Sequence, residues 1–97
     1  MSNYVKSALT RAQLEQERAN VVLNFGVTHC PHCVVGNALA AQIGLTSVMI
    51  EDGPGRKLGR TYGVKLWPTF IALKDGVEVA RIVRPTKLSD LTPLLNV

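Results

Sequence analysis

The chain has 97 residues, of which 46% are hydrophobic and 19% charged, and its formal net charge is +4. This length suits one domain, so we expect residues 1–97 to form a single domain. No apolar stretch approaches the roughly 20 residues of a membrane-spanning helix, so no membrane association is expected. The first twenty residues are polar and lack the apolar block of a secretory signal, which predicts a cytoplasmic protein.

The basic residues are scattered along the sequence, and Arg56-Lys57 is the only adjacent basic pair. Proteins that read nucleic acids usually cluster their basic residues and interleave them with aromatic ones. The aromatic residues here are also dispersed. We therefore interpret the positive charge as a solvated surface and expect no nucleic-acid partner.

The first third of the chain predicts a short strand, a helix and a buried strand. Residues 4–9 can form the short strand. Thr10 and Gln13 match a capping box, in which the Thr10 hydroxyl covers the Gln13 N–H, and good helix formers continue to about Arg18. Residues 21–25 are a compact, β-branched apolar run, typical of a strand buried on both faces.

The central part predicts a helix and a second strand. Apolar residues recur at helical spacing over residues 31–43, Pro31 suits the first turn, and Gly44 supplies a C-cap. Residues 46–50 indicate a second buried strand. Residues 51–55 form a loop.

The last part predicts a short helix over residues 56–62 that ends at Gly63. A hairpin of residues 69–74 and 77–83 follows, because Asp-Gly between two apolar runs favours a tight turn.

Leucines at helical spacing predict a final helix over residues 86–96. Pro93 either delays its start, with Ser89 as the cap, or bends it. The whole order predicts an α/β fold: a three-layer sandwich with a mixed central sheet of four to five strands and helices on both faces.

The chemistry-bearing residues gather in one segment. Cys30 and Cys33 are the only cysteines, and His29 and His32 the only histidines. At the start of a helix, unpaired N–H groups and the helix dipole stabilise an anion, so we expect a lowered pKa for Cys30 and a nucleophilic thiolate. Cys33, one turn further, can resolve a mixed disulfide, and His32 can tune the Cys30 thiolate.

Two other interpretations of this segment stay open. The cysteines could be buried small hydrophobic residues. They could also bind a metal with the two histidines, or an iron–sulfur cluster across a dimer, although four residues within five positions cannot all face one tetrahedral centre. We expect neither a metal nor any other cofactor, and the sequence contains no nucleotide-binding motif.

The sequence resembles the thioredoxin family over most of its length. Val22-Leu23-Asn24-Phe25 followed by Cys30-Pro31-His32-Cys33 is similar to that family's central strand and active-site turn. The segment from Tyr62 to Phe70, then Lys74-Asp75-Gly76, is similar to its cis-proline loop and closing hairpin. A CxxC pair followed 35 residues later by such a proline is a specific combination.

The resemblance implies a cis Pro68 lying against the cysteine pair, and a groove in which an extended substrate segment pairs with the backbone. It places Trp67, Pro68 and Thr69 on one side of that groove. His29 and Pro31 are expected on the other side.

Four positions depart from the family pattern. His29 stands where Trp is common, and Pro-His replaces Gly-Pro between the cysteines, as in periplasmic disulfide oxidases. Asn24 replaces a buried Asp and cannot accept a proton as a base. Arg84-Pro85 replaces a glycine at the groove rim.

We therefore expect the protein to be a monomer that exchanges disulfides with protein substrates. An upstream reductase or glutathione would reduce its oxidised cysteine pair again. An oxidase- or isomerase-like potential set by Pro-His is one alternative. A thioredoxin-fold binding module, in which redox activity is incidental, is the other.

Overall fold

The computed structural model describes residues 4–96 and is built around one four-stranded sheet in the order β2-β1-β3-β4. The strands are β1 (Val21–Gly26), β2 (Val48–Glu51), β3 (Thr69–Lys74) and β4 (Val77–Val83). β1 is parallel to β2 and antiparallel to β3, and β3 is antiparallel to β4. The expected mixed sheet is confirmed.

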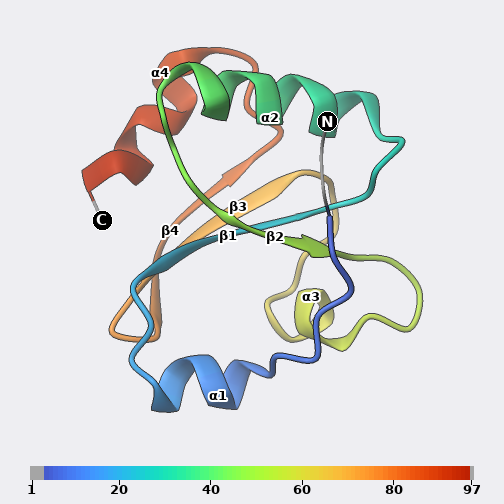
Figure 1. Ribbon diagram of the computed structural model, residues 1–97, viewed down its shortest axis with the longest axis vertical. Coiled ribbons are helices and arrows are strands. Elements are labelled where there is room, and N and C mark those ends of the chain that lie inside the picture. The colour runs from blue at the N-terminus through green and yellow to red at the C-terminus, as the bar shows by residue number, and fades with distance from the viewer. Residues whose placement is uncertain (1–3, 97) are drawn as a thin grey trace.

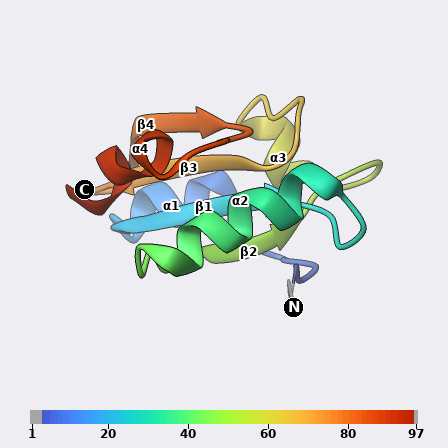
Figure 2. The ribbon, with the colours of Figure 1, turned by 90° about the horizontal axis from the view of Figure 1, so that it is seen from above.

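Helices cover both faces of this sheet, as Figures 1 and 2 show. They are α1 (Arg11–Gln16), α2 (Pro31–Gln42), α3 (Lys57–Thr61) and α4 (Leu88–Leu91), and a 3-10 turn over Thr92–Asn96 follows α4. In Figure 1, α2 and α4 lie on one side of the sheet, and α1 and α3 on the other. This is the predicted three-layer α/β sandwich. No helix of residues 4–96 is both long enough and apolar enough to cross a membrane.

Alternating side chains of β1 and β3 build two separate cores, because successive residues of a strand point to opposite faces. Leu23, Phe25 and Ile71 pack with residues of α1 and α3. Val22 and Phe70 pack on the other face with residues of α2, α4 and the 3-10 turn. Burial on both faces explains why β1 and β3 are near-continuous apolar runs.

The hairpin and the first helix follow the sequence closely. Asp75 and Gly76 have φ of 52° and 79°, the left-handed values that a two-residue hairpin turn requires. Thr10 caps α1: its hydroxyl accepts from the Gln13 N–H, and the Gln13 side chain accepts from the Thr10 N–H. The capping box is confirmed.

The prediction of a first strand over residues 4–9 is wrong. This segment makes a single parallel bridge, between Val5 and Ile50. The Val5 N–H donates to the Met49 carbonyl, and the Val5 carbonyl accepts from the Glu51 N–H. The segment then leaves the sheet to reach α1, so it covers part of the β2 edge without extending the ladder.

Two further predictions need correction. The strand expected over residues 46–50 starts later, at Val48, and Val48 itself is exposed, because β2 is the outer strand of the sheet. The single helix expected over residues 86–96 is a four-residue helix with Lys87 at its N-cap, continued as a 3-10 turn that contains Pro93. Ser89 lies inside the first turn. Proline lacks the N–H that an α-helix interior needs, which suits the change of helix type.

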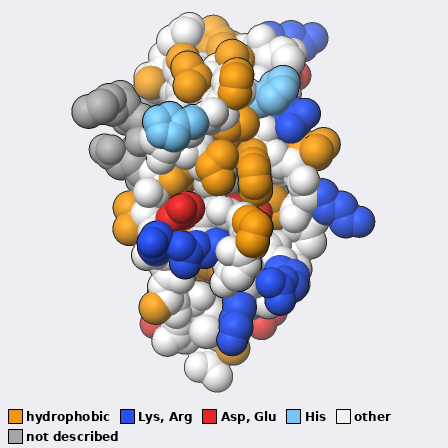
Figure 3. All heavy atoms as spheres, turned by 90° about the vertical axis from the view of Figure 1, so that its right-hand side faces the viewer, with side chains coloured by type: hydrophobic (Ala, Val, Ile, Leu, Met, Phe, Trp, Pro, Cys, Tyr) orange, Lys and Arg blue, Asp and Glu red, His pale blue; other side chains and the backbone are white. Residues whose placement is uncertain are grey.

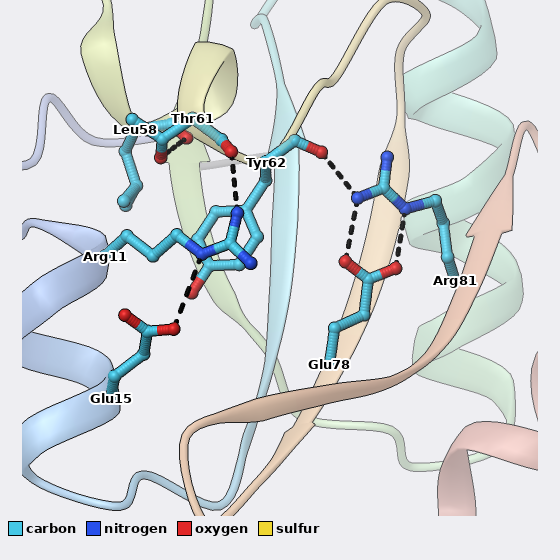
Figure 4. Close-up of polar contacts among 7 residues, drawn as sticks. All are labelled: Arg11, Glu15, Leu58, Thr61, Tyr62, Glu78 and Arg81. Carbon is cyan, nitrogen blue, oxygen red and sulfur yellow. Dashed lines mark hydrogen bonds and ion pairs between the residues drawn. The ribbon is translucent and has the colours of Figure 1, made fainter.

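A buried tyrosine and hydrogen bonds from two arginines join α1, α3 and β4 on the side away from α2 (Figure 4). Arg11 Nη1, for example, donates to the Thr61 carbonyl at 2.8 Å. The Tyr62 ring packs against Phe25, and the Arg11 guanidinium lies 4.6 Å from its centroid. Arg81 donates to the Tyr62 carbonyl and to the Glu78 carboxylate. The hydrogen bond from Arg81 to the Glu78 carboxylate holds the pKa of Glu78 below its usual value. The buried Tyr62 hydroxyl has no hydrogen-bond partner within the described part of the chain.

We expect Tyr62→Phe to stabilise the fold or leave it unchanged, with a gain of up to about 1 kcal/mol in the free energy of unfolding. The substitution keeps the ring contacts and removes a hydroxyl that burial separates from water without a compensating hydrogen bond. Urea unfolding followed by circular dichroism measures the change. A loss of more than about 1 kcal/mol would show that the hydroxyl has a partner.

Candidate active site

The two cysteines lie at the start of α2, one at its cap and one inside its first turn. Cys30 is the N-cap residue, with extended backbone angles, and Pro31 occupies the first helical position. Cys30 is partly exposed, whereas the Cys33 side chain is fully buried. Both are free thiols in this structure. The predicted strand–turn–helix arrangement thus presents one sulfur to solvent and keeps the other inside.

The Trp67–Pro68 segment lies opposite Cys30. The Trp67–Pro68 peptide bond is cis, and the Trp67 carbonyl oxygen lies 4.0 Å from the Cys30 sulfur. Gly36 of α2 makes this approach possible: a Cβ added there would lie 2.8 Å from Cγ of Pro68 and 3.5 Å from Cγ of Pro85. A side chain at position 36 would therefore force the Pro68 segment away from the cysteine pair.

The environment of Cys30 favours its thiolate. Partial burial raises the pKa, but hydrogen bonds from the Cys33 backbone N–H, the Cys33 thiol and the His32 backbone N–H lower it. The positive charge of Arg84 lowers it further. Because these effects outweigh burial, the pKa of Cys30 lies below that of an ordinary cysteine. The helix N-terminus acts here through identifiable N–H groups.

Cys33 has the opposite character. Burial raises the pKa of the Cys33 thiol, and the neighbouring Cys30 thiolate raises it further. The Val27 backbone and the nearby Tyr4 hydroxyl act in the other direction without overcoming this. The two pKa values are shifted in opposite directions, which suits Cys30 to attack a disulfide and Cys33 to resolve the mixed disulfide.

A ring of three hydrogen bonds adjoins Cys33. The Tyr4 hydroxyl donates to Asn24 Oδ1 at 2.9 Å, and Asn24 Nδ2 donates to Asn37 Oδ1 at 2.7 Å. Asn37 Nδ2 closes the ring on the Tyr4 hydroxyl at 3.2 Å. Burial raises the pKa of Tyr4 above its usual value, so the hydroxyl stays protonated. Every member of the ring is uncharged.

Gly26, the last residue of β1, leaves room for this ring. A Cβ at that position would lie 2.6 Å from the Tyr4 hydroxyl and 2.7 Å from the Cys33 sulfur. The two atoms thus border the same small space above Gly26. The N-terminal segment, which sequence analysis treated as a strand, brings a polar group to the resolving cysteine.

Trp67 and Thr69 are each fixed by one hydrogen bond. The Trp67 indole N–H donates to Asp52 Oδ2 at 2.8 Å, and the Thr69 hydroxyl donates to the Leu66 carbonyl at 2.6 Å. Trp67 is half-buried and can form a wall of a groove. Thr69 is only 1% exposed and is paired with both β1 and β4, so it supports the loop from inside.

The remaining predicted groove residues, His29 and Pro31, are exposed, as is His32, which was predicted to tune Cys30. Figure 3 shows both histidines on one face, on either side of a band of hydrophobic side chains. Neither imidazole makes a hydrogen bond to the residues that the structure describes. The documented effect of His32 on Cys30 comes from its backbone N–H. The role of the His32 side chain stays a prediction.

Sequence reasoning missed three residues of the site: Tyr4, Asn37 and Asp52. Tyr4 and Asp52 reach the site from distant parts of the chain, and Asn37, four residues after Cys33 on α2, is marked only by its contacts with Tyr4 and Asn24. Arg84 did give a signal, as a departure from the expected glycine at the groove rim. Its Nε donates to the Trp67 carbonyl at 2.9 Å.

The metal interpretation gains no support from the geometry. Within residues 4–96, no group of three or more His, Cys, Asp or Glu side chains is placed to hold a metal ion. The chemistry that this arrangement can perform is thiol–disulfide exchange, and its fold and cysteine pair define a thiol–disulfide oxidoreductase.

Comparison with solved structures identifies the family. Thioredoxin 2 of Pseudomonas aeruginosa, in its reduced form, is 39% identical, has a TM-score of 0.83, and the match covers 98% of this chain and 93% of that one. A thioredoxin of Fasciola hepatica is 24% identical with a TM-score of 0.65, over 95% and 97% of the two chains. A thioredoxin of Nicotiana alata is 24% identical with a TM-score of 0.63, over 99% and 96%.

No protein-family model matches the chain, and a search of curated proteins also finds no match. The similarity to the Pseudomonas protein nevertheless spans nearly the whole of both chains. The chain belongs to the thioredoxin family.

We expect Cys30 to be alkylated by iodoacetamide with a rate midpoint below about pH 8.5, the usual pKa of a cysteine, and Cys33 to react much more slowly. The lowered pKa increases the thiolate fraction of Cys30 at a given pH, and burial protects Cys33. Tandem mass spectrometry of the native protein locates the label across a pH series. Equal labelling of the two cysteines would contradict the assignment.

We expect Tyr4→Phe to destabilise the protein by about 1–3 kcal/mol, because it leaves the buried Asn24 amide without its hydroxyl partner. Tyr62→Phe is the control, since it removes a hydroxyl from a more deeply buried ring without breaking a hydrogen bond. Urea unfolding of both variants gives the comparison. If the two substitutions have the same effect, the ring beside Cys33 does not contribute to stability.

Proposed function

We propose that this protein exchanges disulfides with protein substrates through Cys30 as the nucleophile and Cys33 as the resolving thiol. The observation that carries the proposal is the contrast between the two sulfurs: Cys30 is partly exposed with a lowered pKa, and Cys33 is buried with a raised one. The Trp67–Pro68 segment opposite Cys30 would bind the substrate, with Trp67 as one wall.

The exchange takes two steps. The Cys30 thiolate attacks a substrate disulfide, so that a mixed disulfide forms and the second substrate sulfur leaves as a thiolate and takes a proton from water. Cys33 then loses its proton and attacks Cys30, which releases the first substrate sulfur as a thiolate. Two electrons have passed to the substrate, and a Cys30–Cys33 disulfide remains.

The route of the Cys33 proton distinguishes this chain. The ring beside Cys33 consists of a phenol and two amides, and an amide cannot act as a base. We assign the Cys33 proton to the departing substrate thiolate, because the ring offers no base. In this proposal, Tyr4 orients the thiol and the proton moves as the sulfur–sulfur bond breaks.

The direction of transfer depends on how strongly the protein stabilises its reduced form. Stabilising the Cys30 thiolate favours the dithiol, which makes the disulfide a stronger oxidant. Because Pro-His separates the two cysteines, as in periplasmic disulfide oxidases, we propose a potential above the roughly −270 mV of thioredoxin. The proposal includes a cytoplasmic setting, a monomeric protein, and a reductase or glutathione that returns the oxidised pair to the dithiol.

We expect the protein to accelerate the reduction of insulin by dithiothreitol, and Cys30→Ser to abolish that acceleration. Cys33→Ser should trap the mixed disulfide, which non-reducing electrophoresis detects as a covalent complex. Equilibration with glutathione buffers then gives the potential. A wild-type rate equal to that of dithiothreitol alone would refute the proposal, as would full activity of Cys30→Ser. Binding of a partner protein that persists in the double variant Cys30→Ser/Cys33→Ser would instead favour the alternative of a binding module.

A further inference from the structure

Arg84 is held in one position by two hydrogen bonds to neighbouring carbonyls. Its backbone N–H donates to the Pro68 carbonyl at 3.0 Å, and its side-chain Nε donates to the Trp67 carbonyl at 2.9 Å. Its φ is 50°, in the left-handed region that residues other than glycine rarely adopt. Such backbone conformations cost energy, and they concentrate at functional sites.

The guanidinium group stands beside the reactive sulfur. Arg84 Nε and the Cys30 sulfur approach the same oxygen atom, the Trp67 carbonyl, at 2.9 and 4.0 Å. The charge of Arg84 also lowers the pKa of Cys30. A substrate sulfur attacked by Cys30 must therefore approach within reach of the guanidinium.

Most of the hydrogen-bonding capacity of Arg84 is unused. A guanidinium has five N–H donors, and only Nε has a partner among residues 4–96. Three other arginines of this part of the chain pair with glutamates: Arg11 with Glu15, Arg56 with Glu51, and Arg81 with Glu78. No described carboxylate forms an ion pair with Arg84, which is half-exposed.

A fixed, half-exposed guanidinium with both terminal nitrogens free is suited to a carboxylate, which it can bind with two parallel hydrogen bonds. If stabilising the Cys30 thiolate were its whole role, the charge alone would suffice. The bond to Trp67 also fixes the plane of the guanidinium, and its terminal N–H groups are then available to a ligand at the groove.

We propose that Arg84 determines substrate specificity by binding a carboxylate next to the disulfide that Cys30 attacks. The inference rests on the proposed function and adds a substrate class to it: disulfides flanked by Asp or Glu. An acidic substrate would otherwise be repelled by the Cys30 thiolate, and Arg84 offsets that repulsion at the point of contact.

Two disulfide-bridged peptides that differ in one residue, Asp or Asn beside the attacked cysteine, test the proposal. The second-order rate constant for reduction of each by the prereduced protein is measured at low ionic strength. We expect the Asp peptide to react about fivefold faster, as befits a partly exposed ion pair, and the ratio to fall as salt is added.

Arg84→Gln should bring the ratio of the two rates close to one, and Arg84→Lys should keep part of the preference. The ratio is the readout because the loss of Arg84 also raises the pKa of Cys30 and slows both reactions. Lys74→Gln is the matched control: it removes one positive charge from the end of β3 that lies away from Pro68 and Arg84, and it should leave the ratio unchanged.

Each outcome decides the inference. A wild-type ratio of one, or a ratio that Arg84→Gln leaves unchanged, would overturn it while the proposed function stands. Failure of the wild-type protein to reduce either peptide would overturn both. If Arg84→Gln does not fold, the salt dependence of the wild-type ratio and the Arg84→Lys variant give the answer: a salt-independent ratio contradicts the proposal.

Discussion

The close packing of α2 against the Pro68 segment is the contact on which the site depends. Gly36 has no side chain, and the ring of Pro68 occupies the space that one would need. This brings the Trp67 carbonyl to the Cys30 sulfur and lets Arg84 reach the same oxygen. The Trp67–Pro68 segment and Arg84 thereby meet at the N-terminus of α2, and the two hydrophobic cores hold these elements in place.

The two faces of the sheet differ in chemistry: polar groups beside the redox pair lie on one face, and an apolar core lies on the other. On the α2 face, Asn24 of β1 turns away from the apolar residues around it and joins a ring of neutral groups beside Cys33. Leu23 and Phe25 point to the other face, where the core with α1 and α3 is apolar. Because successive side chains of a strand point to opposite faces, β1 contributes to the surroundings of the redox pair on one face and to the apolar core on the other.

Local patterns predicted much of this molecule. The Thr10 capping box, the Asp75-Gly76 turn and the Cys30–Cys33 pair each act within a few residues, so their signals survive in the sequence. The partners of the site do not lie close in sequence: Tyr4 meets Asn37 across 33 residues, and Trp67 meets Asp52 across 15. Such pairs are created by topology. The prediction of a strand over residues 4–9 failed for a related reason, since its single bridge is made to Ile50, far away in the sequence.

The bridge between Val5 and the β2 edge has a consequence for the chemistry. Two backbone hydrogen bonds hold Val5 to Met49 and Glu51, and its neighbour Tyr4 borders Cys33. The hydration of the buried thiol is thus tied to whether this segment stays docked. If the segment detached, water would reach Cys33 and the effect of burial on its pKa would be reduced. The protected resolving thiol would then become a second reactive thiol.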